Sequence, residues 1–207
     1  MHPIALNKQL TNIAIFASGT GSNAEKIIES ANNNIAPVPF RVAWIVSNKP
    51  GAGVLNIAAK NGIPTLLIEK EKFFRGNAYV EELKNAGIDF IVLAGFLWKI
   101  PQQLIDAYRN KIINIHPALL PKYGGKGMYG SFVHEAVIAN GDKESGITIH
   151  WVDEHYDHGS IIFQAKCPVL PGDAADTLAG RIHQLEHQHY PEVIFNLVSD
   201  LSTKESF

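Results

Sequence analysis

Short apolar runs alternate with segments of helical spacing over the first half of the chain. The apolar runs are uninterrupted, as is typical of strands buried on both faces, and the segments between them place apolar residues three and four positions apart. Five strands are predicted: Asn12–Ser18, Phe40–Asn48, Ile63–Glu69, Ile88–Phe96 and Lys111–Pro117. Four helices are predicted between them: Ala24–Asn34, Val54–Gly62, Ala78–Gly87 and Pro101–Asn110. Strands that alternate with helices indicate an α/β fold with a mostly parallel central sheet and helices on both faces.

The pattern changes after residue 130, where strands and helices no longer alternate. The later segments read as one helix, two strands and a long C-terminal helix or two, over Ser131–Asp142, Ser145–Glu154, Gly159–Val169 and Asp173–Leu201. Because only the polar stretch HYDH separates the two strands, we expect an antiparallel pair. Pro191 is expected to break or kink the last helical segment near Tyr190, since proline lacks the backbone N–H that a helix interior needs. The simplest organisation is one domain over residues 12–207, after an N-terminal extension of residues 1–11.

Composition and charge narrow the class of protein. Of 207 residues, 46% are hydrophobic and 18% charged, which suits the core of one globular domain. The net charge of −2 gives no reason to expect a nucleic acid or a membrane surface as a partner. The single cysteine, Cys167, lies in an apolar run, so we expect it in the core and the protein in the reducing cytoplasm. No apolar run reaches the length of a membrane span, and the N-terminus lacks the pattern of a signal peptide.

A glycine turn, SGTGSN, joins the first predicted strand to the first predicted helix. Gly19 and Gly21 allow unusual backbone angles and the close approach of a ligand, and the helix N-terminus suits a phosphate. Ser22 and Asn23 add side-chain donors. The alternative is a capped turn that binds nothing. A nicotinamide dinucleotide is not favoured, because no acidic residue ends the second predicted strand.

Asn114 and His116 are two positions apart at the end of the fifth predicted strand, so their side chains point to the same side. Pro117 ends the strand there. The amide could donate a hydrogen bond to a developing oxyanion, and the imidazole could exchange a proton near neutral pH. The structural alternative is an Asn that caps a turn beside a histidine with ordinary partners. Asp157 is a further acid–base candidate, although sequence spacing cannot show that it meets His116.

Five segments together resemble a known family. In chain order, SGTGSN, VSNKPGAG, LAGF, NIHPALLPKY and DHGSIIFQAKCPV are similar to segments of the folate-dependent formyltransferases that act on glycinamide ribonucleotide in purine synthesis. The resemblance extends from about Asn12 to Val198. It implies a single-domain, Rossmann-like formyltransferase fold and 10-formyltetrahydrofolate as co-substrate. The implied reaction is formyl transfer to the primary amine of glycinamide ribonucleotide, without a metal or a covalent enzyme intermediate.

The resemblance also implies roles for individual residues. Asn114, His116 and Asp157 match the catalytic residues of the family. Asn114 and a protonated His116 would stabilise the oxyanion of the tetrahedral intermediate, while Asp157 would hold the histidine and help to move a proton through water. The residues implied to bind the phosphate, ribose and glycinamide of the substrate are Gly21, Ser22, Asn23 and Glu186.

The implied folate pocket consists of residues after the fourth strand, residues of the Asp153–Asp157 loop, and one arginine. These are Leu97, Trp98, Lys99, Ile100, Asp153, Asp157 and Arg75. Trp98 stands where many members have arginine. The glycine-rich stretch Gly124–Gly130 is longer than in many members and is expected to cover the site. His134 follows it and matches a further active-site histidine of the family, as an accessory residue.

Other interpretations remain open at this stage. His183 and His187, with Glu186 between them and His189 after them, could form a metal-binding helix face. No cysteine and no clear third ligand on another element accompany them, so a solvated or substrate-lining helix is favoured. Another formyl-folate enzyme or a non-catalytic nucleotide-binding module would share several features. A tRNA formyltransferase is expected to have a further C-terminal domain and a basic surface, and a formyl-folate hydrolase an N-terminal regulatory domain. We expect only small-molecule partners, glycinamide ribonucleotide and folate, in a monomer or homodimer.

Overall fold

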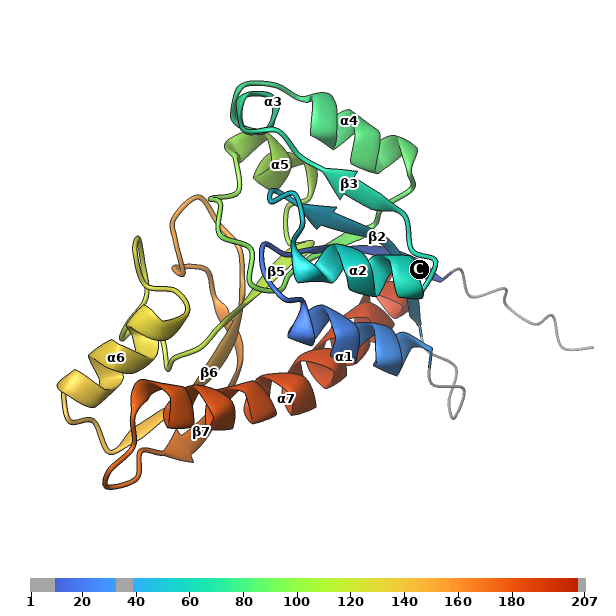
Figure 1. Ribbon diagram of the computed structural model, residues 1–207. Coiled ribbons are helices and arrows are strands. Elements are labelled where there is room, and N and C mark those ends of the chain that lie inside the picture. The colour runs from blue at the N-terminus through green and yellow to red at the C-terminus, as the bar shows by residue number, and fades with distance from the viewer. Residues whose placement is uncertain (1–9, 33–38, 205–207) are drawn as a thin grey trace, which may run out of the picture.

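The computed structural model describes residues 10–32 and 39–204, which form one seven-stranded sheet with helices on both faces (Figure 1). The strands are β1 (Thr11–Phe16), β2 (Phe40–Ser47), β3 (Thr65–Leu67), β4 (Phe90–Leu93), β5 (Ile112–His116), β6 (Glu144–Trp151) and β7 (Ile161–Pro168). The helices are α1 (Ser22–Ala31), α2 (Gly53–Lys60), α3 (Lys70–Arg75), α4 (Ala78–Asn85), α5 (Gln102–Ala107), α6 (Ser131–Ala139) and α7 (Ala175–Lys204).

The strands lie in the order β3-β2-β1-β4-β5-β6-β7. Strands β1 to β5 pair in parallel, whereas β6 is antiparallel to β5 and β7 is antiparallel to β6. The predicted parallel sheet with an antiparallel C-terminal part is thereby confirmed. The order of strands along the chain reverses between β1 and β4. Ligands of open α/β sheets bind outside the carboxyl ends of the strands at such a reversal, so the topology directs attention to the loops after β1 and β4.

The two faces of the sheet are buried against different helices. In β1, Ile13 and Ile15 belong to the core that packs on α1, α2, α6 and α7, while Ala14 and Phe16 belong to the core that packs on α3, α4 and α5. Successive strand residues point to opposite faces, so both sets must be apolar, and this explains the uninterrupted apolar runs of the sequence. Cys167 is buried in the first core, as expected.

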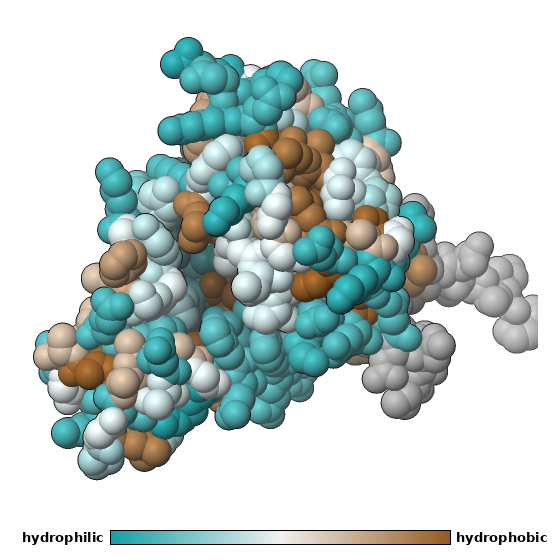
Figure 2. Space-filling view, viewed as in Figure 1, coloured by the Kyte–Doolittle hydropathy of each residue, from teal (hydrophilic) through white to brown (hydrophobic). Residues whose placement is uncertain are grey.

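Hydrophilic residues dominate the face of the molecule shown in Figure 2, and hydrophobic residues form smaller separate groups on it.

Phe73 is the one buried residue of α3, a helix that the sequence pattern missed because so short a segment has no apolar stripe. Asn33, Asn34 and residues 1–9 of the predicted extension lie outside the described residues. Within the described part of the chain, no helix combines the length and hydropathy needed to cross a membrane.

Helix α7 continues through Pro191 as one element, so of the break or kink expected near Tyr190 the break does not occur. Tyr190 is fully buried, and its hydroxyl donates a hydrogen bond of 2.9 Å to the carbonyl oxygen of Leu93. Ile194, one turn later, is fully buried as well. Packing on both sides of the proline therefore holds the helix against the sheet and offsets the missing backbone hydrogen bond.

Candidate active site

A cavity of about 530 Å³ opens at the carboxyl edge of the sheet, where the strand order reverses. Its walls come from the loops after β1, β4 and β5, from the loop between β6 and β7, and from helices α6 and α7. Segments far apart in the sequence thus meet at one site, as expected for a doubly wound sheet.

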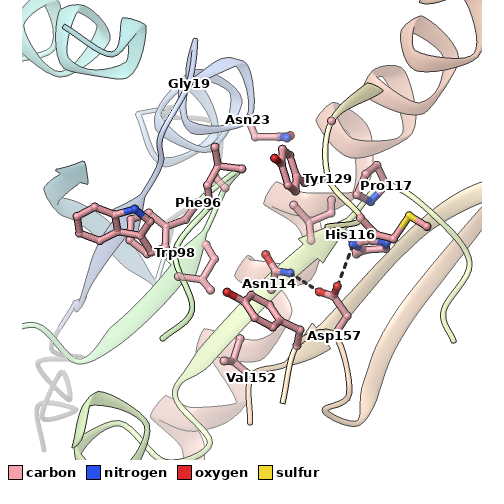
Figure 3. Close-up of a pocket in the computed structure, with 18 of the residues that line it drawn as sticks. Gly19, Asn23, Phe96, Trp98, Asn114, His116, Pro117, Tyr129, Val152 and Asp157 are labelled. Atoms are coloured by element: carbon pink, nitrogen blue, oxygen red, sulfur yellow. Dashed lines mark hydrogen bonds and ion pairs between the residues drawn. The ribbon is translucent and has the colours of Figure 1, made fainter. Parts of the chain in front are cut away.

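Asn114, His116 and Asp157 meet in this cavity (Figure 3). The first two lie on β5, and Asp157 lies on the loop between β6 and β7 with a positive φ of 55°. The carboxylate oxygen Oδ1 is 3.4 Å from Asn114 Nδ2, and Oδ2 is 3.6 Å from His116 Nδ1. The encounter that sequence spacing could not establish is therefore present in the structure.

The surroundings of His116 determine its tautomer. Its Nε2 is 2.7 Å from the carbonyl oxygen of Tyr123, which can only accept, so Nε2 must carry a hydrogen. In the neutral ring Nδ1 then turns a lone pair toward Asp157, and protonation would turn this nitrogen into a donor. Burial lowers the pKa of His116. Asp157 and the Tyr123 carbonyl raise it, but not enough to bring it back to its ordinary value. The resting imidazole is therefore neutral near pH 7.

Asp157 is ionised in the same setting. Burial alone would raise its pKa, but the neighbouring His150 and His116 side chains and the Gly125 amide together hold the pKa below its ordinary value. The Gly125 N–H donates to Oδ2 at 2.9 Å. A buried carboxylate stays charged only when donors surround it in this way.

His150 is a member of this site that the sequence reasoning missed. It lies on β6 directly opposite Asn114 on β5. Its Nδ1 is 2.8 Å from the carbonyl oxygen of Trp151 and so carries a hydrogen, which leaves Nε2 to accept from Asn114 Nδ2 at 3.2 Å. A polar residue in an otherwise apolar stretch of β6 was the available signal. Of the two contacts of the Asn114 amide, the 3.4 Å contact with Asp157 is the longer and the easier to exchange for a ligand.

The glycine-rich segment Gly124–Gly130 covers one side of the cavity, and Gly125 to Gly130 line it. A Cβ on Gly124 would lie 2.6 Å from Leu120 Cδ2 and 3.3 Å from the Cβ of Asp157. A side chain at position 124 would therefore require Leu120 and Asp157 to shift. The segment is held to Asp157 by the Gly125 amide.

The turn after β1 forms another end of the cavity. Gly21 has a φ of 87°, and a Cβ there would lie 2.8 Å from Val54 Cα, so both conformation and space require glycine. The first backbone bond of α1 runs from Glu25 N–H to the Gly21 carbonyl, which leaves the N–H groups of Ser22 and Asn23 ahead of it without a helical acceptor. These groups can bind an anion.

Glu186 on α7 reaches the same end of the cavity. It is 6% exposed, and its Oε2 accepts a hydrogen bond of 2.8 Å from Asn23 Nδ2. Burial raises the pKa of Glu186, and the hydrogen bond from Asn23 opposes this rise. Asn23 and Glu186 are therefore in contact, although they are distant in sequence. The family resemblance implies that both bind the same substrate.

The loop after β4 forms an apolar wall of the cavity through Leu97, Trp98, Lys99 and Ile100. The Trp98 ring packs on three aromatic rings at centroid distances of 5.7 to 6.4 Å, those of Phe73, Phe74 and Phe96. Lys99 Nζ lies 5.9 Å from the ring centroid of Tyr156, in the loop that also brings Asp153 to the cavity. Trp98 consequently serves both the packing of α3 and the cavity surface.

Two further candidates differ in their placement. Arg75 is 80% exposed on α3, is 3.1 Å from Glu71 in an ion pair, and does not line the cavity. His134 lines the cavity and is 3% exposed, and its Nδ1 has no hydrogen-bond partner among the described residues. Burial lowers the pKa of His134, and nearby His183 and His116 lower it further. His134 is therefore a neutral side chain with a free nitrogen at the site.

The rings of His183 and His187 stack on α7 with centroids 6.2 Å apart. His183 lines the cavity together with Glu186. In the part of the chain that the structure describes, no three His, Cys, Asp or Glu side chains are grouped so that they could hold a metal ion. This helix face is thus a wall of the cavity.

Known proteins are similar to this chain in sequence and in fold. A family model described as formyl transferase matches residues 11–194. The chloroplastic phosphoribosylglycinamide formyltransferase of Vigna unguiculata is 46% identical over 186 residues, which are 88% of this chain and 59% of the relative. The phosphoribosylglycinamide formyltransferase of Haemophilus influenzae is 34% identical over 189 residues, which are 89% of this chain and 86% of the relative.

The crystal structure of glycinamide ribonucleotide transformylase 1 from Geobacillus kaustophilus superposes with a TM-score of 0.83 at 37% identity and covers 92% of this chain and 100% of that chain. The chain spans less than two thirds of two plant relatives, 59% of the Vigna protein and 63% of its counterpart in Arabidopsis thaliana. The match to the family model nevertheless runs through every strand of the sheet and most of α7. This chain belongs to the formyl transferase family.

Proposed function

We propose that this chain transfers the formyl group of 10-formyltetrahydrofolate to the primary amine of glycinamide ribonucleotide, giving the formylated amide and tetrahydrofolate. The observation that carries the proposal is the meeting of Asn114, His116 and Asp157 in a cavity between an anion-binding helix end and an apolar wall. The names of the relatives support the same reaction. This reaction is the step of purine synthesis that the resembling family of formyltransferases catalyses.

The cavity has a place for each substrate. The phosphate of glycinamide ribonucleotide binds at Gly21, Ser22 and Asn23, and Glu186 contacts the ribose or the glycinamide. The pterin of the folate binds between the loop of Leu97, Trp98, Lys99 and Ile100 and the loop of Asp153 and Asp157. Arg75 has no part in this arrangement, because it lies outside the cavity. This placement brings the amine and the formyl carbon together beside β5.

The reaction begins when the amine nitrogen attacks the formyl carbon. A carbon–nitrogen bond forms, the carbonyl electron pair moves onto oxygen, and a tetrahedral oxyanion results. The Asn114 amide exchanges its long contact with Asp157 for a hydrogen bond to this oxygen. Donors directed at the developing charge lower the barrier because they need little reorganisation.

The proton lost by the amine passes to the pair of His116 and Asp157, directly or through water. His116 is neutral at rest, so it can accept this proton, and the imidazolium then lies beside both the carboxylate and the oxyanion. The proton next moves to the folate nitrogen, whose bond to the formyl carbon breaks as the carbonyl re-forms. His134 is an accessory residue that stays neutral nearby. The amine loses one hydrogen and the folate nitrogen gains one, so the step is balanced.

The deciding experiment measures initial rates from the absorbance change of the folate, with glycinamide ribonucleotide as acceptor. Parallel reactions offer methionyl-tRNA, an amino sugar nucleotide, or water alone as acceptor. We expect turnover with glycinamide ribonucleotide and background rates with the others. Turnover only with another acceptor would replace the proposed substrate, and binding of the ribonucleotide without turnover would indicate a nucleotide-binding module.

Three broader features of the protein are also proposed: its domain organisation, its compartment and its assembly. Residues 12–207 act as one formyltransferase domain after an extension of residues 1–11. The protein works in the cytoplasm as a monomer or homodimer. Fractionation of the source cells tests the compartment, since two relatives are chloroplastic, and sedimentation equilibrium tests the assembly.

A further inference from the structure

Tyr129 is an unassigned side chain of the cavity. It lies on the glycine-rich segment, lines the cavity and is 49% exposed. Its hydroxyl makes no hydrogen bond with the described residues, although a tyrosine hydroxyl both donates and accepts. A polar group held at the mouth of a site without a protein partner is available to a ligand.

The position of Tyr129 is set by its surroundings. Gly125 is bound to Asp157 through its N–H, and the N–H of Met128 donates to the Gly125 carbonyl at 3.1 Å, which closes a turn just before Tyr129. The φ angles of Gly125, Gly127 and Gly130 are 94°, 93° and 56°, a region that favours glycine. The turn therefore has a defined shape.

The ring itself is held from one side. Tyr129 and Phe132 form an edge-to-face pair with centroids 5.4 Å apart and planes at 90°. Both rings are about half exposed, so the contact restricts the tyrosine without burying it. Phe132 belongs to the first turn of α6, and it fixes the ring relative to the scaffold.

In Figure 3 the Tyr129 side chain extends from its segment into the cavity toward Asn23 on the first turn of α1. That turn offers N–H groups from one side only. A phosphate has three peripheral oxygens, and those turned away from α1 need donors from the opposite rim. Tyr129 is on that rim, whereas the folate wall of Leu97 to Ile100 lies after β4.

We propose that the Tyr129 hydroxyl donates a hydrogen bond to the phosphate of the amine substrate and so makes the site selective for a phosphorylated amine. The inference rests on the proposed function for the identity of that substrate. It assigns the glycine-rich segment to substrate recognition. The donor is neutral, so the contact adds selectivity without adding a fixed charge.

The test compares Tyr129→Phe with the unaltered protein, using glycinamide ribonucleotide and the corresponding nucleoside that lacks the phosphate. For the ribonucleotide, KM should rise about 10- to 100-fold, the range for losing a hydrogen bond to a charged group, with kcat and the folate KM unchanged. For the dephosphorylated substrate, the two proteins should have the same kcat/KM. Phe132→Ala should raise the ribonucleotide KM by a smaller factor, because it frees the tyrosine ring.

The matched control is Tyr108→Phe. The Tyr108 hydroxyl is buried with no partner among the described residues, and it lies outside the cavity, so its loss should leave both KM values unchanged. An unchanged ribonucleotide KM in Tyr129→Phe overturns the inference. So does an equal loss with the dephosphorylated substrate, or a rise in the folate KM instead.

Direct binding separates this inference from the proposed function. Isothermal titration with ribose 5-phosphate needs no turnover, and Tyr129→Phe should weaken its binding by a factor similar to the rise in KM. If the unaltered protein binds ribose 5-phosphate but fails to formylate glycinamide ribonucleotide, the proposed function fails and the phosphate contact stands. If both proteins bind ribose 5-phosphate equally, the phosphate contact fails, whatever the turnover.

Discussion

Replacing Asp157 by asparagine removes one negative charge from the centre of the proposed site and keeps the size of the side chain. Asparagine can still accept from the Gly125 N–H, which donates to Oδ2 at 2.9 Å in the native protein. The main loss is the attraction between the carboxylate and a proton on His116 Nδ1, 3.6 Å away. The substitution therefore tests electrostatic stabilisation with little change in packing.

The magnitude follows from this distance. At an effective dielectric constant of about 20, unit charges 3.6 Å apart attract by about 5 kcal/mol. His116 is neutral at rest and charged only during proton transfer, so nearly all of this attraction arises in the transition state. Each ~1.4 kcal/mol is a factor of ten in rate, so kcat should fall by about three orders of magnitude.

Single-turnover mixing with saturating folate measures this rate without a contribution from product release. The KM for glycinamide ribonucleotide should change little, and thermal denaturation should show an intact fold. Asp106→Asn is the control, because Asp106 lies on α5 outside the cavity and pairs with Arg109. A rate in Asp157→Asn within tenfold of the native rate would refute the electrostatic role.

Three further outcomes follow from the same geometry. Asn114→Ala should lower kcat by about 100- to 1,000-fold through loss of an oxyanion donor, measured in the same assay with KM as the internal control. Gly21→Ala should lower the free energy of unfolding, measured by urea denaturation, by about 1–3 kcal/mol, because φ at this position is 87° and the new Cβ meets α2. Gly19→Ala is the control and should leave that free energy unchanged, because the space around Gly19 is open. The log of kcat/KM should rise with pH through a pKa below 6.5, because burial lowers the pKa of His116 and its neutral form accepts the proton. Asp157→Asn should move that midpoint to still lower pH, because the carboxylate raises the pKa of His116. A midpoint that moves to higher pH would contradict the assignment of His116 as the proton acceptor.

The fold was predictable from the sequence because burial on both faces leaves uninterrupted apolar runs. Ile13, Ala14, Ile15 and Phe16 show this directly, since alternate residues face two separate helical layers and all four are buried. The continuity of α7 through Pro191 was not predictable, because it depends on packing of Tyr190 and Ile194 against the sheet. Local propensity cannot weigh such long-range contacts.

From strand and turn patterns, the site was predictable in its β5 component and in the glycine turn after β1. Asn114 and His116 share a side of one strand, and strand periodicity reveals this. The placement of Asp157 and His150 depends on the register between β5 and β6 and on a left-handed residue in the following loop. The neutrality of His116 depends on burial and its tautomer on the Tyr123 carbonyl, neither of which sequence spacing reveals.

The segment Gly124–Gly130 connects the two ends of the site through the backbone. Gly125 holds the carboxylate of Asp157, and four residues later Tyr129 is directed toward the α1 turn. Because one turn carries both residues, the same backbone positions the proposed phosphate donor and the amide that binds the catalytic carboxylate. The pKa of Asp157 is held down partly by the Gly125 amide, so this backbone also helps to keep the carboxylate ionised. Selection of the substrate and positioning of the catalytic carboxylate would then depend on the same seven residues.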